Sequence, residues 1–544
     1  MRVWAARCLF VSWLVNSILA QGVDPIGRID PRARPLTEVA SFAVAALNRP
    51  AIDAEDVRRH GNGEPARYAI PFPVQVTSAA NGTWQELDAT WSLWRVRVQA
   101  PGASHVNLGF SVCRLPATAR LQVYSVDYAD IVRPFTAADV SANGELWTPV
   151  VQGSEVVVEM YVQTAQRPQL QLTVGQVGSG YRFFGAGPTA VATGMPEAGP
   201  CHIDVACAQG AAWLTEISGV GAMSSAGSIF CTGAMLNNTA QDGRRFFLTA
   251  HHCQVTAGNA ASLVVYWNYQ YERCGGSGPA ASSGFTTGST LRASHAATDF
   301  TLLELNASPD PAWGVTWLGW ERTCDCASSA TTIHHPSGNP KKISVENDPI
   351  EITSYGGTTS PGDGTHIRVV DWDAGSTEPG SYGAPLFNQN KRVVGQLHGG
   401  SAACGNNASD YYGRFSMSWT GGGTPGTRLS DWLDPGNTGV RFFNSGASAP
   451  FASAPTYTLG TAALYHSAFR QPMVREENIS LSKRFRWQLN DTRAVDFVYR
   501  ADMFNLFNRT NFGVNGTIGN AGFGAATGPQ SGPRIITMGL RLDF

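Results

Sequence analysis

The cysteines of this chain are confined almost entirely to one stretch, which limits how that stretch can fold. Eight of the ten lie between Cys201 and Cys404. An even set within one domain favours a disulfide framework if the chain is exported. Zinc binding is the weaker interpretation, because no C-x-x-C pair is accompanied by a second pair at finger spacing. We therefore expect a cross-linked domain over residues 201–444, with no metal and no other cofactor.

The N-terminus has the pattern of an export signal. Arg2 and Arg7 supply the basic region, residues 8–18 are apolar, and Leu19-Ala20-Gln21 offers a cleavage point. The apolar run is shorter than the ~20 residues that span a bilayer, which disfavours a membrane anchor. Residues 1–20 are therefore predicted to be a signal peptide.

Length and charge restrict the remaining classes. A chain of 544 residues exceeds what one core can hold, and at ~150 residues each it suggests three or four domains. The formal net charge is only −2, so neither nucleic acid nor an anionic membrane surface is indicated as a partner.

The fold class is predicted to be mostly β. Residues 21–184 alternate apolar and polar side chains between turn-rich stretches, which is typical of a β-sandwich. Residues 185–200 and 445–455 are rich in small residues and read as linkers. Between them, residues 201–444 again carry short strands and glycine-rich turns, with a helix expected near residues 427–433.

Residues 456–544 differ in character. Ile536, Met538, Leu540 and Leu542 alternate with polar residues, and similar alternation runs through 479–487 and 495–500. Such strands resemble the last strands of an outer-membrane β-barrel, and residues 502–513 resemble the end of TonB-dependent receptors. Three or four strands cannot close a barrel. An ordinary amphipathic sheet that packs on the preceding domain is the alternative. Secretion or a place in the cell envelope, periplasm or outer membrane, of a Gram-negative-type bacterium follows as an expectation.

Three segments carry residues suited to acyl-transfer chemistry. They are Leu248-Thr249-Ala250-His251-His252-Cys253, then Thr298-Asp299-Phe300, then Pro379-Gly380-Ser381-Tyr382-Gly383-Ala384-Pro385. Serine hydrolases need an imidazole base, a carboxylate that orients it and backbone N–H groups for the oxyanion. The order histidine, aspartate, nucleophile is that of the trypsin fold, a double β-barrel. The third segment has the Gly-x-Ser-Gly-x-Pro frame, but tyrosine occupies the serine position.

The domain over residues 201–444 resembles the lysyl endopeptidases, which are secreted bacterial members of the trypsin-like superfamily. The matching runs lie at residues 201–205, 264–270, 333–336, 395–400 and 428–435. The order of signal peptide, pro-segment, protease domain and C-terminal extension also resembles that family's precursor. The barrel-like segment at the end does not belong to the family.

The resemblance implies a role for each matching residue. His252, which directly precedes the cysteine, would be the general base, and Asp299 would orient it. The N–H groups of Gly380 and Tyr382 would face the oxyanion. Asp410 matches the acid at the floor of the specificity pocket, where it would pair with a cationic P1 side chain.

Two more residues of the expected pocket are implied in the same way. His398 matches a histidine near the pocket, and Tyr355 stands where the family has tryptophan. The expected ligand or substrate is a peptide or protein with Lys or Arg. The pair His334 and His335 has no companion metal ligands nearby in the sequence, so a structural role is expected for it.

The family's disulfide pattern would pair Cys201 with Cys404, Cys207 with Cys274, and Cys231 with Cys253. Each disulfide would contribute roughly 2–4 kcal/mol to stability. Cys324 and Cys326 are extra to this pattern, and their state stays open.

Tyr382 decides what chemistry remains. A phenol carries its oxygen several ångströms beyond the position of a serine hydroxyl, and its pKa is ~10. Ser381 cannot substitute, because neighbouring residues of a tight turn point differently. Residues 21–200 also contain no lysine, so self-processing with lysine specificity is excluded there. A catalytically impaired protease homologue is therefore predicted. The alternatives are an active endopeptidase that cleaves after basic residues, and an outer-membrane-associated component that acts through its C-terminal strands.

Overall fold

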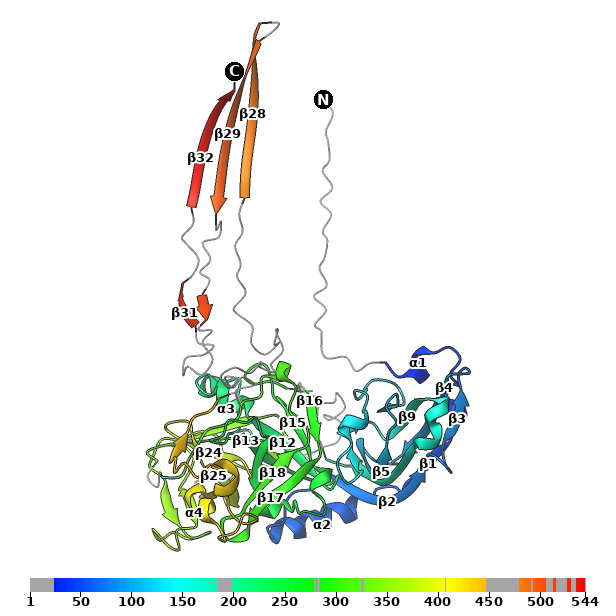
Figure 1. The fold of residues 1–544 in the computed structure, drawn as a ribbon. Coiled ribbons are helices and arrows are strands. Elements are labelled where there is room, and N and C mark those ends of the chain that lie inside the picture. Colours follow the sequence, from blue (N-terminus) through cyan, green and yellow to red (C-terminus); the bar gives the residue numbers. More distant parts are fainter. Residues whose placement is uncertain are drawn as a thin grey trace. The chain divides into compact units, whose positions relative to one another are not determined.

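A computed structural model of the chain describes residues 24–182, 198–277, 280, 284–323, 327–406, 408–446, 479–490, 493–504, 512–514, 526–529 and 535–543 (Figure 1). The expected signal peptide, most of both expected linkers, and Cys324 and Cys326 lie outside the described residues. The chain divides into two compact units, Met1–Ser448 and Ala449–Phe544. The mostly β fold class is confirmed by the element order.

The N-terminal part of the first unit consists of two five-stranded sheets. One has the strand order β1-β4-β9-β6 with β3 beside β4, and the other β2-β10-β5-β7 with β8 beside β5. The strands are β1 (Ser41–Ala43), β2 (Ala69–Thr77), β3 (Thr83–Glu86), β4 (Trp91–Gln99), β5 (His105–Arg114), β6 (Arg120–Ser125), β7 (Leu146–Trp147), β8 (Val151–Gln152), β9 (Glu155–Gln163) and β10 (Gln171–Gly180). Short helices accompany them: α1 (Ile26–Ile29), η1 (Leu36–Glu38), α2 (Arg49–Gly61), η2 (Ala137–Asp139) and η3 (Thr164–Gln169).

The two sheets pack on one another around a single apolar core. Trp94 and Val158 of one sheet and Phe110 and Val174 of the other belong to the same buried cluster. Each fully buried side chain of this kind stabilises the fold by about 1.5–3 kcal/mol. Two apposed sheets with a shared core form a β-sandwich.

The protease-like part begins with a seven-stranded antiparallel sheet in the order β16-β15-β12-β13-β14-β18-β17. Its strands are β12 (Val220–Ser225), β13 (Ile229–Leu236), β14 (Phe246–Ala250), β15 (Val264–Trp267), β16 (Gly284–Thr287), β17 (Ser289–His295) and β18 (Phe300–Leu305). The helix α3 (Leu214–Ser218) precedes these strands, η6 (His251–Cys253), η7 (Ala260–Ser262) and η8 (Ala296–Thr298) lie between them, and η9 (Pro311–Trp313) follows β18.

A ten-stranded sheet follows, in the order β11-β21-β20-β24-β25-β26-β23-β22, with β19 beside β25 and β27 beside β19. Its strands are β11 (Ile203–Asp204), β19 (Trp320–Glu321), β20 (Ala330–His334), β21 (Lys342–Glu346), β22 (Glu351–Thr353), β23 (His366–Val369), β24 (Pro385–Asn388), β25 (Val393–Gly400), β26 (Asp410–Arg414) and β27 (Phe442–Phe443). The helices are η5 (Ala208–Gly210), η10 (Pro336–Gly338), α4 (Phe415–Thr420) and α5 (Ser430–Leu433). The helix expected over residues 427–433 is thus confined to its last four residues.

The two large sheets share a core. Phe246 and Leu302 of the seven-stranded sheet and Ile333 and Phe387 of the ten-stranded sheet are completely buried in one cluster. This shared core holds the loops at the ends of both sheets in fixed positions, which is the property that a site built from both sheets requires.

The N-terminal sandwich also contacts the seven-stranded sheet directly. The Tyr68 N–H donates to the Ser228 carbonyl at 2.7 Å, and the Phe230 N–H donates to the Ala66 carbonyl at 3.1 Å. The Tyr68, Val150, Phe230 and Tyr266 side chains are buried in one mixed cluster. The two regions are therefore joined by backbone pairing and by a common apolar layer.

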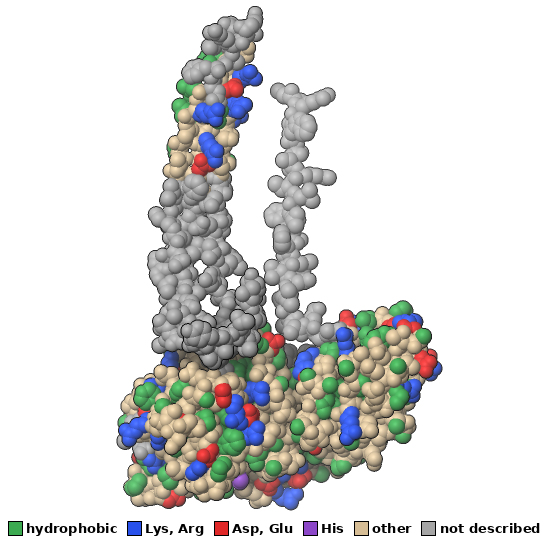
Figure 2. Space-filling view, viewed as in Figure 1, with side chains coloured by type: hydrophobic (Ala, Val, Ile, Leu, Met, Phe, Trp, Pro, Cys, Tyr) green, Lys and Arg blue, Asp and Glu red, His purple; other side chains and the backbone are tan. Residues whose placement is uncertain are grey.

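The second unit contains a three-stranded antiparallel sheet in the order β28 (Ile479–Asn490), β29 (Arg493–Phe504) and β32 (Ile535–Asp543), and a small pair of β30 (Phe512–Val514) with β31 (Ala526–Pro529). The register pairs Phe485 with Phe497 and Phe497 with Leu542, so the apolar residues of the three strands share one face. These side chains are exposed, and Figure 2 shows hydrophobic and basic side chains gathered on this unit. Residues 505–511, part of the segment compared with TonB-dependent receptors, lie outside the described residues.

No helix within the described part of the chain is long and apolar enough to span a membrane.

Candidate active site

The register of two strands brings His252 and Asp299 together. β14 pairs with β18 so that Ala250 lies opposite Phe300. His252 follows β14 in the turn η6, and Asp299 precedes β18 in a left-handed conformation with φ 50°. The Asp299 carboxylate accepts hydrogen bonds from the His252 backbone N–H and from His252 Nδ1, both at 2.9 Å. The aspartate therefore orients the imidazole by two contacts.

A second histidine lies beside this pair. The His398 ring stacks on the His252 ring with centroids 5.3 Å apart, and His398 Nε2 is 3.9 Å from Asp299 Oδ2. Tyr355 covers the other side of His398 with centroids 3.7 Å apart. The Tyr355 ring is half exposed, so it forms an outer wall of the site.

His366 of β23 extends this group, and no local motif in the sequence points to it. Its Nε2 is 2.9 Å from His398 Nδ1. Burial lowers the pKa of His366 and of His398 to about 4. Both rings are therefore neutral near pH 7.

The loop that carries Tyr382 is held tightly against the seven-stranded sheet. Thr232 donates its backbone N–H to the Tyr382 carbonyl at 2.9 Å and its hydroxyl to the Gly380 carbonyl at 2.9 Å. Gly380 and Gly383 have φ of +102° and +83°, which side chains rarely adopt. At Gly383 a Cβ would also lie 2.3 Å from Thr249 Oγ1. The loop therefore requires glycine at both positions.

Tyr382 is partly buried and lies against His252. Its ring meets the His252 ring edge-on with centroids 4.6 Å apart. A Cβ at Gly399 would lie 3.3 Å from Tyr382 Cε1, so the ring also contacts the end of β25. Burial, the Tyr355 phenol and the Asp410 carboxylate raise the pKa of Tyr382 to about 12. The phenol therefore stays protonated at physiological pH.

Ser381 points into the interior, away from His252. Its hydroxyl is completely buried and lies 2.7 Å from His334 Nδ1. His334 Nε2 in turn contacts the Ser344 hydroxyl at 3.1 Å. Burial lowers the pKa of His334 well below its usual range, so this ring is neutral. The contacts of His334 are those of a structural residue that fixes the loop.

Among the described residues, the N–H groups of Gly380 and Tyr382 have no hydrogen-bond acceptor. The amides around them are all paired: Ser381 donates to the Glu378 carbonyl at 3.0 Å and Gly383 to the Leu397 carbonyl at 2.8 Å. Two unpaired donors in an otherwise bonded loop are the arrangement that an oxyanion hole uses.

Asp410, at the start of β26, is completely buried. Its Oδ2 accepts hydrogen bonds from Trp372 Nε1 at 2.8 Å and from the Thr377 hydroxyl at 2.7 Å. Its Oδ1 has no partner within the part of the chain that the structure describes. Burial raises the pKa of Asp410 to about 6, against the effect of these two hydrogen bonds. A buried carboxylate with one free oxygen can receive a cationic side chain.

Three disulfides frame the site. Cys201 is bonded to Cys404, Cys207 to Cys274, and Cys231 to Cys253. The third joins β13 to the turn that carries His252, and so limits the movement of the imidazole.

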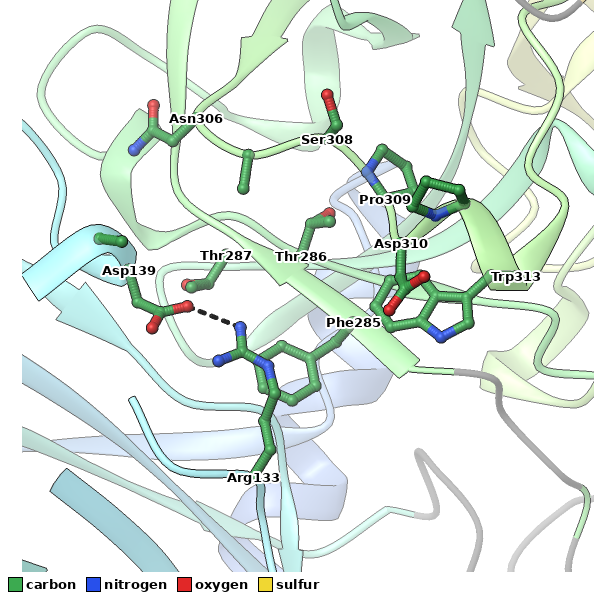
Figure 3. A pocket seen from close by; sticks show the side chains of 13 residues that line it. Arg133, Asp139, Phe285, Thr286, Thr287, Asn306, Ser308, Pro309, Asp310 and Trp313 are labelled. Carbon is green, nitrogen blue, oxygen red and sulfur yellow. Dashed lines mark hydrogen bonds and ion pairs between the residues drawn. The ribbon is translucent and has the colours of Figure 1, made fainter. Parts of the chain in front are cut away.

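A cavity of about 420 Å³ lies apart from this site, between the N-terminal sandwich and the protease-like part (Figure 3). Arg133 lies over the Phe285 ring at 5.1 Å and forms an ion pair with Asp139 at 2.6 Å. None of the residues predicted for catalysis or substrate binding lines this cavity.

The protease-like part holds the His252–Asp299 pair at the end of the seven-stranded sheet, against the Tyr382 loop that leads into the ten-stranded sheet. Residues 195–413 match the family described as lysyl endopeptidase, C-terminal domain, and residues 45–179 match lysyl endopeptidase N-terminal domain. Residues 375–537 match an outer membrane beta barrel domain, a range that overlaps the first match. The chain is 29% identical to a lysyl endopeptidase of Pseudomonas aeruginosa over 406 residues, which cover 67% of this chain and 83% of the relative.

Two solved structures illustrate the structural comparison. A Glu endopeptidase in complex with MPD is 14% identical and covers 40% of this chain and 92% of its own, with a TM-score of 0.27. The MamO protease domain from Magnetospirillum magneticum is 10% identical and covers 38% and 96%, with a TM-score of 0.26. On the sequence matches, the chain is a distant homologue of the lysyl endopeptidases, with regions that match both of their domain models and a region that matches an outer membrane beta barrel domain.

Proposed function

We propose that the protease domain binds peptides through a Lys or Arg side chain and is catalytically impaired by Tyr382. Membership of a serine protease family implies a peptide substrate or ligand. The free oxygen of the buried Asp410 supports a cationic P1 side chain, because a desolvated carboxylate gains most from an opposite charge.

The observation that carries the impairment is the position of the Tyr382 ring against His252. A serine hydroxyl would meet His252 through its oxygen, whereas here an aromatic edge fills that space. With a pKa of about 12 the phenol gives up its proton to an imidazole only rarely. Loss of a triad member leaves only ~10³–10⁴ over the uncatalysed rate from binding and the oxyanion hole.

The test is hydrolysis of a lysine ester by the full-length chain with its disulfides formed. We expect the Tyr382→Ser variant to exceed the wild type at least about a hundredfold, since a serine would restore the triad. Tyr382→Phe is the matched control that keeps the ring and removes the hydroxyl, and it should be as inactive as the wild type.

The other outcomes are equally informative. A wild type that turns over near the rate of Tyr382→Ser, with Tyr382→Phe inactive, would contradict the impairment and establish the active endopeptidase. Tyr382→Ser/Asp410→Asn separates the pocket from the nucleophile, because loss of the carboxylate should weaken binding of the lysine ester and spare that of a phenylalanine ester.

A second function is favoured by the C-terminal strands. We propose that they associate with an outer membrane, because β28, β29 and β32 expose an apolar face, and β28, β29 and the first residues of β32 lie in the region that matches a barrel domain. β28 and β29 have 12 residues and β32 has 9, near the 9–11 residues of a transmembrane strand. Cell fractionation tests this proposal. Recovery of the intact chain wholly in the culture medium would contradict it.

A further inference from the structure

Polar atoms of His252, Asp299 and His398 converge beside Tyr382, and they include more hydrogen-bond acceptors than donors. His252 Nδ1 is 2.9 Å and His398 Nε2 is 3.9 Å from the same oxygen, Asp299 Oδ2. One ligand atom from each of the three side chains lies within 4.8 Å of the other two. This cluster is independent of Tyr382, and so of whether the chain hydrolyses anything.

A chain of hydrogen bonds fixes the tautomer of His398. The Thr365 hydroxyl donates its single proton to Asp363 Oδ1 at 2.7 Å. Thr365 Oγ1 must therefore accept from His366 Nδ1, which lies 2.7 Å away. A neutral imidazole has one N–H, so His366 Nε2 is an acceptor. The 2.9 Å contact between the rings then requires that His398 Nδ1 donates to His366 Nε2.

This tautomer determines what His398 Nε2 can do. Its proton is used toward His366, so His398 Nε2 presents a lone pair. The nearest charged group is the Asp299 carboxylate, which also presents lone pairs. Two acceptors that face one another are stabilised when a cation lies between them.

We propose that His252, Asp299 and His398 form a binding site for a divalent transition-metal ion of the Zn²⁺ class. Two imidazole nitrogens and one carboxylate oxygen are a ligand set of zinc sites that keep a fourth position open. Tetrahedral bonds of about 2.0–2.1 Å place ligand atoms roughly 3.3 Å apart. The separations of 2.9 and 3.9 Å from Asp299 Oδ2 lie on either side of that value, and all three ligand atoms lie within 4.8 Å of one another, so the side chains would have to draw together to complete the site.

The surrounding contacts are those that orient metal ligands. The outer nitrogen of His398 is held by His366, and the second oxygen of Asp299 is held by the His252 backbone N–H at 2.9 Å. Outer contacts of this kind fix the tautomer and direction of a ligand. A metal ion bound at His252 Nδ1 would shift the ring proton from Nδ1 to Nε2, so Nε2 could not accept a proton while the ion is bound.

The test is calorimetric titration of the full-length, disulfide-bonded chain with Zn²⁺. We expect the wild type to bind one ion that His398→Gln does not bind. His398 is partly exposed, so this variant should fold, and its thermal unfolding without metal checks that it does. His295→Gln is the matched control, because it removes a histidine of the same domain outside the cluster and should keep the ion.

A second variant tests the hydrogen-bond chain from Thr365 through His366 to His398. Thr365→Val keeps the shape of the side chain and removes the acceptor that sets the tautomer, so Zn²⁺ affinity should fall about tenfold. Co²⁺ supplies a readout that does not depend on activity, because its visible absorption bands report tetrahedral coordination by the wild type and should be lost in His398→Gln.

Three results would overturn the proposal. Equal Zn²⁺ stoichiometry and affinity in the wild type and His398→Gln would place the ion elsewhere or show that none binds. Mg²⁺ bound as tightly as Zn²⁺ would show a simple carboxylate site. Unchanged affinity in Thr365→Val would remove the tautomer argument.

Discussion

At the scale of single residues, the environment of Asp410 makes ligand binding depend on pH. Burial raises its pKa to about 6, so the carboxyl group is ionised above that pH and neutral below it. A cationic ligand pairs with the ionised form. Binding of a lysine-containing peptide should therefore be complete at pH 8 and should weaken as the pH falls through about 6.

Titration of the peptide at pH 8 and at pH 5 measures this effect, with Asp410→Asn as the variant that should bind weakly at both values. The stability of the unliganded chain depends on pH in the opposite direction from ligand binding. Because the folded-state pKa lies above that of an unfolded aspartate, Asp410 favours the folded state most when it is protonated. A peptide that binds equally at both pH values would contradict the assignment of Asp410 as its partner.

Gly380 makes a second prediction at this scale. A Cβ there would lie 2.1 Å from Phe230 Cε2 and 3.0 Å from the His335 carbonyl, at a φ of +102°. Gly380→Ala should lower the free energy of unfolding by about 1–3 kcal/mol. Chemical denaturation measures it, and Gly426→Ala is the control, because a Cβ at Gly426 meets nothing within 4 Å.

At the scale of elements, the disulfide between Cys231 and Cys253 secures the turn that carries His252. It closes a loop with a sequence separation of 22 residues. Replacement of both cysteines by alanine should lower the free energy of unfolding by about 3 kcal/mol, mainly because the unfolded chain gains freedom. An unchanged denaturation midpoint and slope would show that the shared core alone holds the turn.

The pairing of the sandwich with β13 makes another prediction for elements. A protease site inserted at residues 185–200 would allow the linker to be cut. We expect the two parts to co-elute in gel filtration after cleavage, because residues 66–68 pair with residues 228–230 and a mixed apolar cluster covers the contact.

The Tyr266→Phe variant tests how much one hydrogen bond contributes to the association of the two cut parts. The Tyr266 hydroxyl accepts a hydrogen bond from the buried Val150 N–H at 3.0 Å. Loss of the acceptor leaves that donor unpaired, which costs about 1–3 kcal/mol and should weaken association of the cut parts roughly tenfold or more. If the two parts of the cleaved chain that keeps Tyr266 separated completely, that result would contradict a stable interface.

At the scale of the whole molecule, the C-terminal unit is distinguished by its exposed apolar face. Met538, Leu540 and Leu542 are 69%, 62% and 49% exposed on β32. Leu540→Arg should reduce flotation of the full chain with lipid vesicles, because a basic residue on a lipid-facing strand costs up to about 2–4 kcal/mol. Arg541→Lys, on the opposite face, is the control. Equal flotation of wild type and Leu540→Arg would contradict membrane contact through this face.

Many of the strands and the positions of the candidate site residues could be predicted from the sequence, because they depend on the pattern of neighbouring residues. The strands of the C-terminal unit follow directly from the alternation around Leu540 and Phe485. The positions of His252 and Asp299 follow from motifs in fixed order. The short helix α5 was predicted too long, because the sequence does not reveal that its backbone hydrogen bonds begin only at the Leu429 carbonyl.

The remaining contacts depend on tertiary structure. His366 is 32 residues from His398, and Trp372 and Thr377 are 38 and 33 residues from Asp410, so no local pattern joins them. Strand register sets the first of these distances, and the packing of the loop between β23 and β24 sets the other two. By itself, the sequence determined the resemblance to the lysyl endopeptidases, the strands, and a tyrosine where that resemblance expects the nucleophile. Only the tertiary structure decided that Tyr382 lies edge-on against His252, that Ser381 turns inward, and that His252, Asp299 and His398 converge, because packing rather than sequence spacing fixes side-chain direction.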